Sequence, residues 1–259
     1  MRNATLLLTV TFIVGLLVSG SAFADEKLPS STQAALKKLA DPATADSGVG
    51  TNTRRHARNK VVSSGPLAVP ALVKMVQDSE VLIVRANALI AIVEIASKNP
   101  NAAPQAEELF LSLLTSIDFP LRYWAFKGAG EVKSKQAVPR LVERLVVEQE
   151  DPAMRMQAVL SLGQIGDTQA VKPLIAALQS ESDGSLRAAA ADALKLINER
   201  SAVDVLASEL AKTTDPRVRS ACAEALSVVS GCRVATVLQT SDDVQHALDE
   251  WRVCWDAKQ

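Results

Sequence analysis

A unit of sequence running from Asp151 to Leu178 recurs in weaker form along the chain. Each copy has an Arg after an apolar residue, a small residue three positions later and a β-branched residue ten positions later. The steps between these arginines are 37, 33, 32 and 32 residues, at Arg85, Arg122, Arg155, Arg187 and Arg219. A period of this length is typical of solenoids, in which each unit buries its apolar face only against its neighbours.

The best-formed copy predicts two amphipathic helices joined by a tight turn. Asp151 can accept hydrogen bonds from the free N–H groups of a helix start, and Pro152 fits the first helical turn. We expect Gly163 and Gly166 to end this helix, because Gly166 can adopt a positive φ. The apolar stripe of the first helix is Met154, Ala158, Leu162 and Ile165. That of the second helix is Val171, Leu174, Ile175 and Leu178.

These residues resemble HEAT repeats, and most closely the phycobilisome-lyase-type HEAT-like repeats. The resemblance rests on DPAMRMQA at 151–158, LGQIGD at 162–167 and DPRVR at 215–219, and covers roughly residues 30 to 230. It implies an all-α solenoid of about six antiparallel helix pairs with a C-terminal capping helix. It also implies that the Arg-bearing helices line a concave surface, and that Asp and Arg form a ladder between repeats. The ladder residues would be Asp118, Arg122, Asp151, Arg155, Asp183, Arg187, Asp215 and Arg219.

The first 24 residues have the pattern of a secretory signal. Arg2 precedes an apolar core of thirteen residues, Leu6 to Val18, and a small-x-small cleavage site follows at 22–24. Thirteen apolar residues fall short of the roughly 20 that a membrane span needs, so we expect cleavage and no span in the mature chain. We expect a mature protein from Asp25 in the periplasm or outside the cell. The predicted divisions are 1–24 as signal peptide, 25–232 as solenoid and 233–259 as C-terminal cap.

Charge narrows the class of partner. Without Arg2 the chain has 27 basic and 29 acidic residues, which disfavours general binding to nucleic acid. One dense basic run stands near the N-terminus, formed by Arg54, Arg55, Arg58 and Lys60. Such a run is either a solvated helix face or a site for an anionic partner.

Catalytic chemistry has little support in the residue types. Two His and three Cys residues have no metal-ligand spacing, so no catalytic residue, metal or cofactor is expected. His56 and His246 each precede Ala, whereas deoxyhypusine hydroxylase, a HEAT-like enzyme, binds iron through His-Glu pairs. A signal peptide would also separate the chain from the cytoplasmic phycobiliproteins on which bilin lyases act. We therefore expect a non-catalytic scaffold that binds a protein or peptide, with a lyase-like or hydroxylase-like enzyme as the alternative.

Positions two, five and nine past each repeat Arg point away from the apolar stripe, so the resemblance places them on the concave face. In the third repeat they include an aromatic and a cation, a combination that is typical of protein interfaces. The predicted partner-binding residues are Trp124, Lys127 and Glu131, flanked by Asn87, Glu94, Gln157 and Gln164. The alternative is that Trp124 packs into the core between neighbouring helices.

The three cysteines leave at least one thiol unpaired. Cys222 occupies the small-residue position of its repeat, which predicts a buried free thiol. Cys232 and Cys254 flank the predicted cap, and an exported protein meets an oxidising compartment. We expect a disulfide between Cys232 and Cys254, with three reduced thiols as the alternative.

Overall fold

The computed structural model describes residues 28–42, 48–99, 104–147 and 150–259, and throughout these residues the regular structure is helical. The expected signal peptide, 1–24, lies outside the described residues. Six successive helix pairs and a terminal helix make up the described part, so the predicted all-α solenoid is confirmed. The chain divides into two compact units, at residues 92 and 93. Among the described residues, every helix is too short or too polar to span a bilayer.

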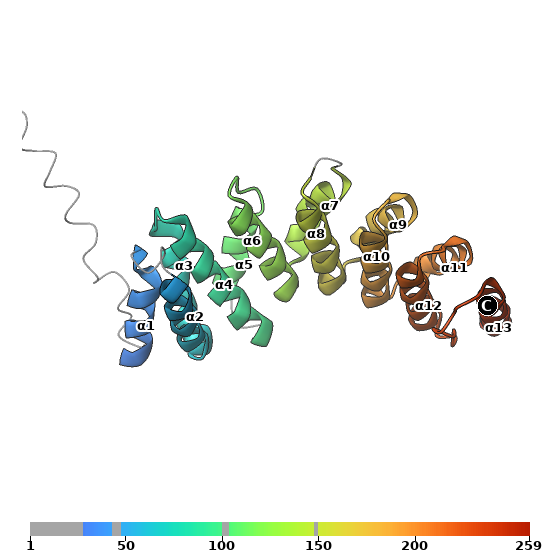
Figure 1. Ribbon diagram of the computed structural model, residues 1–259, viewed down its shortest axis with the longest axis horizontal. Helices are drawn as coiled ribbons and strands as arrows, with labels where there is room; N and C mark the ends of the chain where they lie inside the picture. The colour runs from blue at the N-terminus through green and yellow to red at the C-terminus, as the bar shows by residue number, and fades with distance from the viewer. Residues whose placement is uncertain (1–27, 43–47, 100–103, 148–149) are drawn as a thin grey trace, which may run out of the picture. The chain divides into compact units, whose positions relative to one another are not determined.

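The first unit is built from the N-terminal helices (Figure 1). They are α1 (Ser30–Ala40), α2 (Gly48–Val62), α3 (Val69–Asp78) and the first part of α4 (Leu82–Lys98). A hydrogen bond of 2.6 Å joins the hydroxyls of Thr32 and Ser64, so the start of α1 lies beside the end of α2. Leu36, Leu39 and Val61 are fully buried where α1 packs on α2. The two helices therefore form an antiparallel pair.

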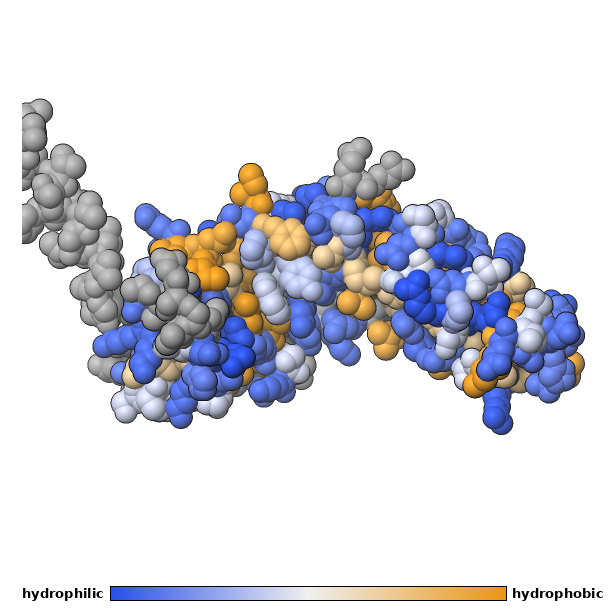
Figure 2. Space-filling model, viewed as in Figure 1, coloured by the Kyte–Doolittle hydropathy of each residue, from blue (hydrophilic) through white to orange (hydrophobic). Residues whose placement is uncertain are grey.

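The second unit contains four repeated pairs and the terminal helix (Figure 1). Helices α6, α8, α10 and α12 pack on one another in succession, and each carries its partner helix, α5, α7, α9 or α11. Hydrophilic side chains predominate on the visible surface over α9 to α12 (Figure 2). The helices are α5 (Pro104–Leu113), α6 (Phe119–Glu131), α7 (Val138–Val146), α8 (Pro152–Ile165), α9 (Val171–Ser180), α10 (Gly184–Ile197), α11 (Val203–Lys212), α12 (Pro216–Ser230) and α13 (Ser241–Asp256).

Small residues allow the successive helices to approach closely. Gly163 lies inside α8, where an added Cβ would stand 2.8 Å from the Cα of Ala193 on α10. The prediction that Gly163 ends its helix is therefore wrong, because this glycine serves helix packing. Gly166 does end α8, with a φ of 74°.

The turns after α6, α8 and α10 each use a residue with left-handed backbone. Lys133, Gly166 and Asn198 each stand eleven positions past a repeat Arg, with φ values of 53°, 74° and 57°. A short 3-10 helix follows each turn and leads into α7, α9 or α11. These short helices are η4 (Lys135–Ala137), η5 (Thr168–Ala170) and η6 (Arg200–Ala202). The same backbone path thus recurs although only one of the three turn residues is glycine.

Helix α13 closes the C-terminal end of the second unit by packing on α11. Its start has a capping box formed by Thr240 and Asp243. The buried Trp251 donates a hydrogen bond of 3.1 Å from its indole N–H to the Ser230 hydroxyl at the end of α12. An internal helix pair packs against the next repeat. At the end of the stack, packing of α13 with its buried Trp251 takes the place of that repeat.

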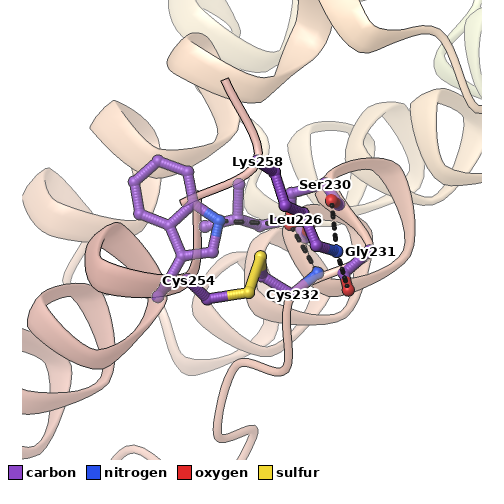
Figure 3. Close-up of a disulfide and its surroundings, with 7 residues drawn as sticks. Leu226, Ser230, Gly231, Cys232, Cys254 and Lys258 are labelled. Atoms are coloured by element: carbon purple, nitrogen blue, oxygen red, sulfur yellow. Dashed lines mark hydrogen bonds between the residues drawn. A yellow bond between two sulfur atoms is a disulfide. The ribbon is translucent and has the colours of Figure 1, made fainter. Parts of the chain in front are cut away.

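The end of α12 is also joined to α13 covalently (Figure 3). Cys232 and Cys254 form a disulfide with a Cα–Cα distance of 5.9 Å. Beside it, the Lys258 ammonium donates a hydrogen bond of 2.6 Å to the Gly231 carbonyl. Cys222 lies buried within α12 as a free thiol, and burial raises its pKa to about 12, with the charge of Glu209 adding to the effect.

Candidate functional site

An aromatic cluster with one cation lies on α6. We call Phe119, Tyr123, Trp124 and Lys127 the α6 surface. The rings of Phe119 and Tyr123 stack at 6.1 Å, and Tyr123 meets Trp124 edge-on at 5.7 Å. The Lys127 ammonium lies 5.2 Å from the centre of the Trp124 ring, within cation–π range. In Figure 2, apolar and weakly polar side chains gather over α6.

Local sequence explains why these rings stay outside the core. Phe126 is completely buried and points inward with Leu121 and Ala125, so the residues between them face outward. Phe119 remains 39% exposed, and Ile117 in the preceding loop is 93% exposed. Trp124 is half-buried. Its exposure is therefore intermediate between that expected of a residue that anchors a partner and that expected of a core residue. The α6 surface and Ile117 thus form a partly exposed, mainly aromatic area whose most exposed side chains are Phe119 and Ile117.

Two of the flanking residues are not available to a partner. Asn87, in the first unit, is buried and donates its amide to the Ile83 carbonyl at 2.8 Å. Gln157, on α8, is buried and donates to the Ser161 hydroxyl at 3.0 Å. The prediction that Asn87 and Gln157 contact a partner is therefore wrong, because both side-chain amides are buried and form hydrogen bonds within the protein. Of the remaining predicted residues, Glu94 and Glu131 are half-buried and Gln164 is exposed.

The predicted site does not include Phe119, Tyr123 and Ile117. A signal for two of them was present, since four of the seven aromatic residues after residue 24 lie between 119 and 126. The fixed register of two, five and nine positions past Arg122 excluded the two aromatics, because they fall at other offsets. The T-shaped and stacked contacts show that the cluster is organised by ring packing and not by the repeat register.

The expected Asp–Arg ladder is replaced by an Arg–Glu ladder. Arg122, Arg155 and Arg187 form ion pairs with an acidic residue of the following repeat, namely Glu150, Glu181 and Glu209. The three glutamates are largely buried, with side-chain exposures of 7%, 12% and 8%. Each pair therefore connects one repeat to the next.

The aspartates of the predicted ladder have a different task. Asp151, Asp183 and Asp215 each accept a hydrogen bond of 2.7 to 2.9 Å from a backbone N–H two positions later, which caps their own helix. The prediction that they pair with Arg155, Arg187 and Arg219 is wrong, because these guanidinium groups bond to Glu181, to Glu209 and to backbone carbonyls. Asp118 precedes α6 in the same position.

Each repeat arginine also bonds to a backbone carbonyl of the helix that comes before its own in the chain, or of the loop after that helix. Arg155 Nε donates to the Leu145 carbonyl at 3.2 Å, and Arg187 Nε donates to the Leu178 carbonyl at 2.9 Å. At the last repeat, where α13 follows in place of another pair, Arg219 donates to the Thr213 carbonyl after α11 at 3.2 Å and also to the Leu238 carbonyl at 3.0 Å. A guanidinium with several fixed donors is suited to join three segments at once.

The electrostatics of the ladder favour ionised glutamates. Burial by itself opposes ionisation of Glu181, but the hydrogen bond and charge of Arg155 and two backbone N–H groups outweigh it, so the pKa of Glu181 is lowered. Lys195 of α10 shows a parallel case on the surface. Burial disfavours its charge, but Asp192 and Glu224 raise the pKa of Lys195 overall.

The basic run near the N-terminus separates into two kinds of residue. Arg54 is 4% exposed and donates to the Asp41 carbonyl at 2.9 Å, as a repeat arginine does. Arg58 donates to the Asn87 amide oxygen at 3.2 Å. These two arginines are structural, so the predicted patch is narrower than expected. Arg55 and Lys60 remain exposed.

The described side chains offer no group of metal ligands. Within the described ranges, no three His, Cys, Asp or Glu side chains are placed together so as to hold a metal ion. His246 lies on α13 beside Glu250, with 3.3 Å between Nε2 and Oε1, and both side chains are exposed.

Comparison with known families agrees with this architecture. The HEAT repeat family matches residues 106–195 and 171–248, which together cover more than half of the chain. The chain belongs to the HEAT-repeat family.

The curated relatives are more specific. Bilin biosynthesis protein PecE of Mastigocladus laminosus is 41% identical over 68 residues, which is 26% of this chain and 25% of that protein. PecE of Nostoc sp. (strain PCC 7120 / SAG 25.82 / UTEX 2576) is 42% identical over 67 residues, 26% of each chain. The chain thus matches about a quarter of the length of each relative. The expected resemblance to phycobilisome-lyase-type repeats is confirmed.

These relatives correct the functional expectation. A non-catalytic scaffold, and the expectation that the chain is not an enzyme, are wrong, because the matched proteins are bilin biosynthesis proteins. The lyase-like alternative agrees better with them.

Comparison with solved structures gives two distant matches. Human deoxyhypusine hydroxylase in complex with glycerol is 18% identical, with a TM-score of 0.37 and coverage of 92% of this chain and 94% of that one. The complex of CpcE and CpcF of phycocyanin lyase from Nostoc sp. PCC7120 is 17% identical, with a TM-score of 0.42 and coverage of 85% and 82%.

Proposed function

We propose that this protein is a bilin-lyase-type enzyme, which helps to make or break the bond between a bilin and its carrier protein. The observation that carries the proposal is the 41% identity with the bilin biosynthesis protein PecE over 68 residues. A second PecE matches at the same level. Bilins are open-chain tetrapyrroles, so the proposed substrates are a bilin and a protein.

The α6 surface is the place we propose for docking of the carrier protein. Its aromatic rings are held by contacts with one another, so little side-chain freedom is lost on binding. Aromatic side chains with a neighbouring cation contribute much of the affinity at protein interfaces. Ile117 extends the apolar area beyond the rings. Lys127, with its ammonium over Trp124, adds a charge that an acidic group on the carrier can meet.

The repeat stack supports this role by keeping the surface rigid. The Arg–Glu pairs and the close Gly163–Ala193 contact join each pair to the next in the second unit. A lyase must hold a bilin and a carrier in a productive orientation, and fixed geometry is the main way in which a protein lowers the entropy cost of a two-substrate reaction.

Bilin transfer tests the function. The purified chain is incubated with a bilin and apo-phycocyanin, and mass spectrometry under denaturing conditions follows the gain of one bilin mass on the carrier. We expect faster gain with the chain than without it. Trp124→Ala should weaken carrier binding by about 2 kcal/mol. Trp255→Ala is the matched control, because Trp255 is also half-buried beneath a cation, with the Arg200 guanidinium 4.5 Å from its ring. Equal carrier affinity of the two variants would exclude the α6 surface.

We also propose that the protein works outside the cytoplasm after removal of residues 1–24, so that its own carrier is an exported protein and apo-phycocyanin serves in the assay as a stand-in for it. The signal pattern of the N-terminus supports this, and a disulfide between Cys232 and Cys254 suits an oxidising compartment. The mass of the protein recovered from the periplasm tests it. An N-terminus at Asp25 is expected, and a full-length cytoplasmic product would overturn the proposal.

A further inference from the structure

The two units of the chain carry opposite net charge. Residues 28–92 contain eight Lys and Arg against four Asp and Glu, whereas residues 93–259 contain 18 against 23. Charges inside the first unit are not spread evenly, because α1 and α2 carry most of the basic residues. A local excess of one charge raises the concentration of oppositely charged ligands near the surface.

A groove between α1 and α2 lies within this basic region. The cavity has a volume of about 520 Å³, which falls in the range of small-molecule sites in proteins. Three alanines, Ala34, Ala35 and Ala57, line it and leave space that larger side chains would fill. Two lysines, Lys38 and Lys60, and His56 also line it. Among the described residues, no acidic side chain lines it. The groove thus combines a small apolar floor with cationic side chains.

The two lysines stand at opposite ends of the groove. The Thr32–Ser64 hydrogen bond places the start of α1 beside the end of α2, and hence Lys60 near the start of α1. Lys38 stands six residues beyond Thr32, about 9 Å along the helix at 1.5 Å per residue. Their ammonium groups can therefore meet two separate anionic groups of one ligand.

The cationic groups are available for a ligand. Both lysines are exposed, and among the described residues neither ammonium has an ion-pair partner. Nδ1 of His56 bonds to the Asn52 carbonyl at 2.8 Å, so Nδ1 is the donor and Nε2 is left for other contacts. An anion in the groove would thus gain two charge-assisted hydrogen bonds without breaking an existing ion pair.

We propose that the groove between α1 and α2 binds a dicarboxylate with an apolar body, one carboxylate at each lysine. The alanines would contact the body and the lysines the two charges. Resting on the proposed function, the natural ligand is a bilin, because its conjugated chain of four pyrrole rings carries two propionate groups. The lysines then act as positioning residues for the bilin while the carrier protein binds elsewhere.

Calorimetric titration of the chain from Asp25 to Gln259 tests whether the groove binds a dicarboxylate. The probes are sebacate, a flexible dicarboxylate, and decanoate, a monocarboxylate of the same carbon number. We expect sebacate to bind about tenfold more tightly than decanoate, because one added hydrogen bond to a charged group contributes about a factor of ten. The double variant Lys38→Gln/Lys60→Gln should lose at least that factor for sebacate. Lys37→Gln/Lys74→Gln is the matched control, because both lysines are exposed in the same unit and neither lines the groove.

Biliverdin and its dimethyl ester form the second arm, since the ester keeps the body and removes both charges. Weaker binding of the ester, and of biliverdin to Lys38→Gln/Lys60→Gln, would support the groove as the bilin site. Sebacate binding equally to both double variants would overturn the groove. Biliverdin binding equally to both would also overturn it while leaving the bilin function intact. Sebacate behaving as expected while biliverdin fails to bind would support the groove and contradict the bilin function.

Discussion

Arg155 of α8 pairs with Glu181, which follows α9, and the same guanidinium bonds to the Leu145 carbonyl near the end of α7. One side chain therefore joins three successive helices of the second unit. The equivalent arginines Arg122 and Arg187 make the same kind of connection. The stack is held by these charged contacts as well as by its apolar core.

Removing this arginine should weaken folding. Arg155→Ala leaves the largely buried Glu181 carboxylate and the Leu145 carbonyl without their donor, so we expect a loss of about 2 kcal/mol in the free energy of unfolding. Urea unfolding followed by circular dichroism measures it. Arg140→Ala serves as control, because Arg140 pairs with Glu143 on the surface and should change stability little. Equal midpoints for the two variants would contradict the ladder.

The same pair predicts a pH dependence. The pKa of Glu181 is lowered in the folded protein, so its contribution to stability is full above the pKa of the unfolded carboxyl group. It is lost as the pH falls through the lower folded pKa, because protonation breaks the pair with Arg155. The difference in Tm between the wild type and Arg155→Ala should therefore shrink from pH 6 to pH 3. A constant difference over this range would argue against an ionised Glu181.

Because α8 and α10 pack closely, adding one methyl group at Gly163 should lower the stability of the fold. In Gly163→Ala the new Cβ would stand 2.8 Å from the Ala193 Cα, which is backbone and cannot rotate away. We expect a loss of about 1 to 3 kcal/mol from overpacking. The melting temperature reports it. Alanine normally stabilises a helix interior relative to glycine, so an unchanged or raised Tm would show that the helices lie farther apart.

The turn after α6 predicts a stabilising change. Lys133 adopts a φ of 53°, a region that costs an L-residue roughly 1 to 2 kcal/mol and costs glycine little. Lys133→Gly should therefore raise the free energy of unfolding by up to about 1 kcal/mol, after its greater unfolded-state entropy is included. The neighbouring exposed Lys135→Gly is the comparison, since no positive φ is found there. A lower stability for Lys133→Gly would contradict the turn geometry.

The C-terminal cap predicts the behaviour of the cysteines. A disulfide that closes a loop of 22 residues should stabilise the fold by about 3 kcal/mol, which Cys254→Ser would remove. The thiol of Cys222 is buried and its pKa is raised to about 12, so it should not react with a thiol reagent at pH 8 before unfolding. Mass spectrometry without reduction measures both. Three reactive thiols in the native protein would contradict the cap structure.

The repeat pattern of the sequence predicts the helix pairs well, because Asp caps, apolar stripes and turn residues all act locally. It does not predict the Arg–Glu ladder. Glu150, Glu181 and Glu209 stand 28, 26 and 22 residues past their arginines, so they share no register that comparison of the repeats could detect. Contacts between repeats depend on how far each loop carries the chain.

The candidate site divides in the same way. The sequence predicts that Trp124 and Lys127 face outward together, since one helical turn separates them. It does not predict that Asn87 and Gln157 are buried, because this depends on which helix packs against them. The sequence does not predict the groove between α1 and α2, for a related reason. Ala34, Ala35 and Ala57 are ordinary helix residues, and a cavity arises only where small residues of two helices meet.

The absorbance spectrum of a bilin on mixing with the purified chain tests the central claim most directly, because it needs no knowledge of the carrier protein. A bilin-lyase-type enzyme must bind its chromophore, and a fixed, partly desolvated tetrapyrrole absorbs differently from a free one. We predict a saturable spectral change at one bilin per chain with biliverdin. A spectrum that equals the sum of bilin and protein at every ratio would contradict it.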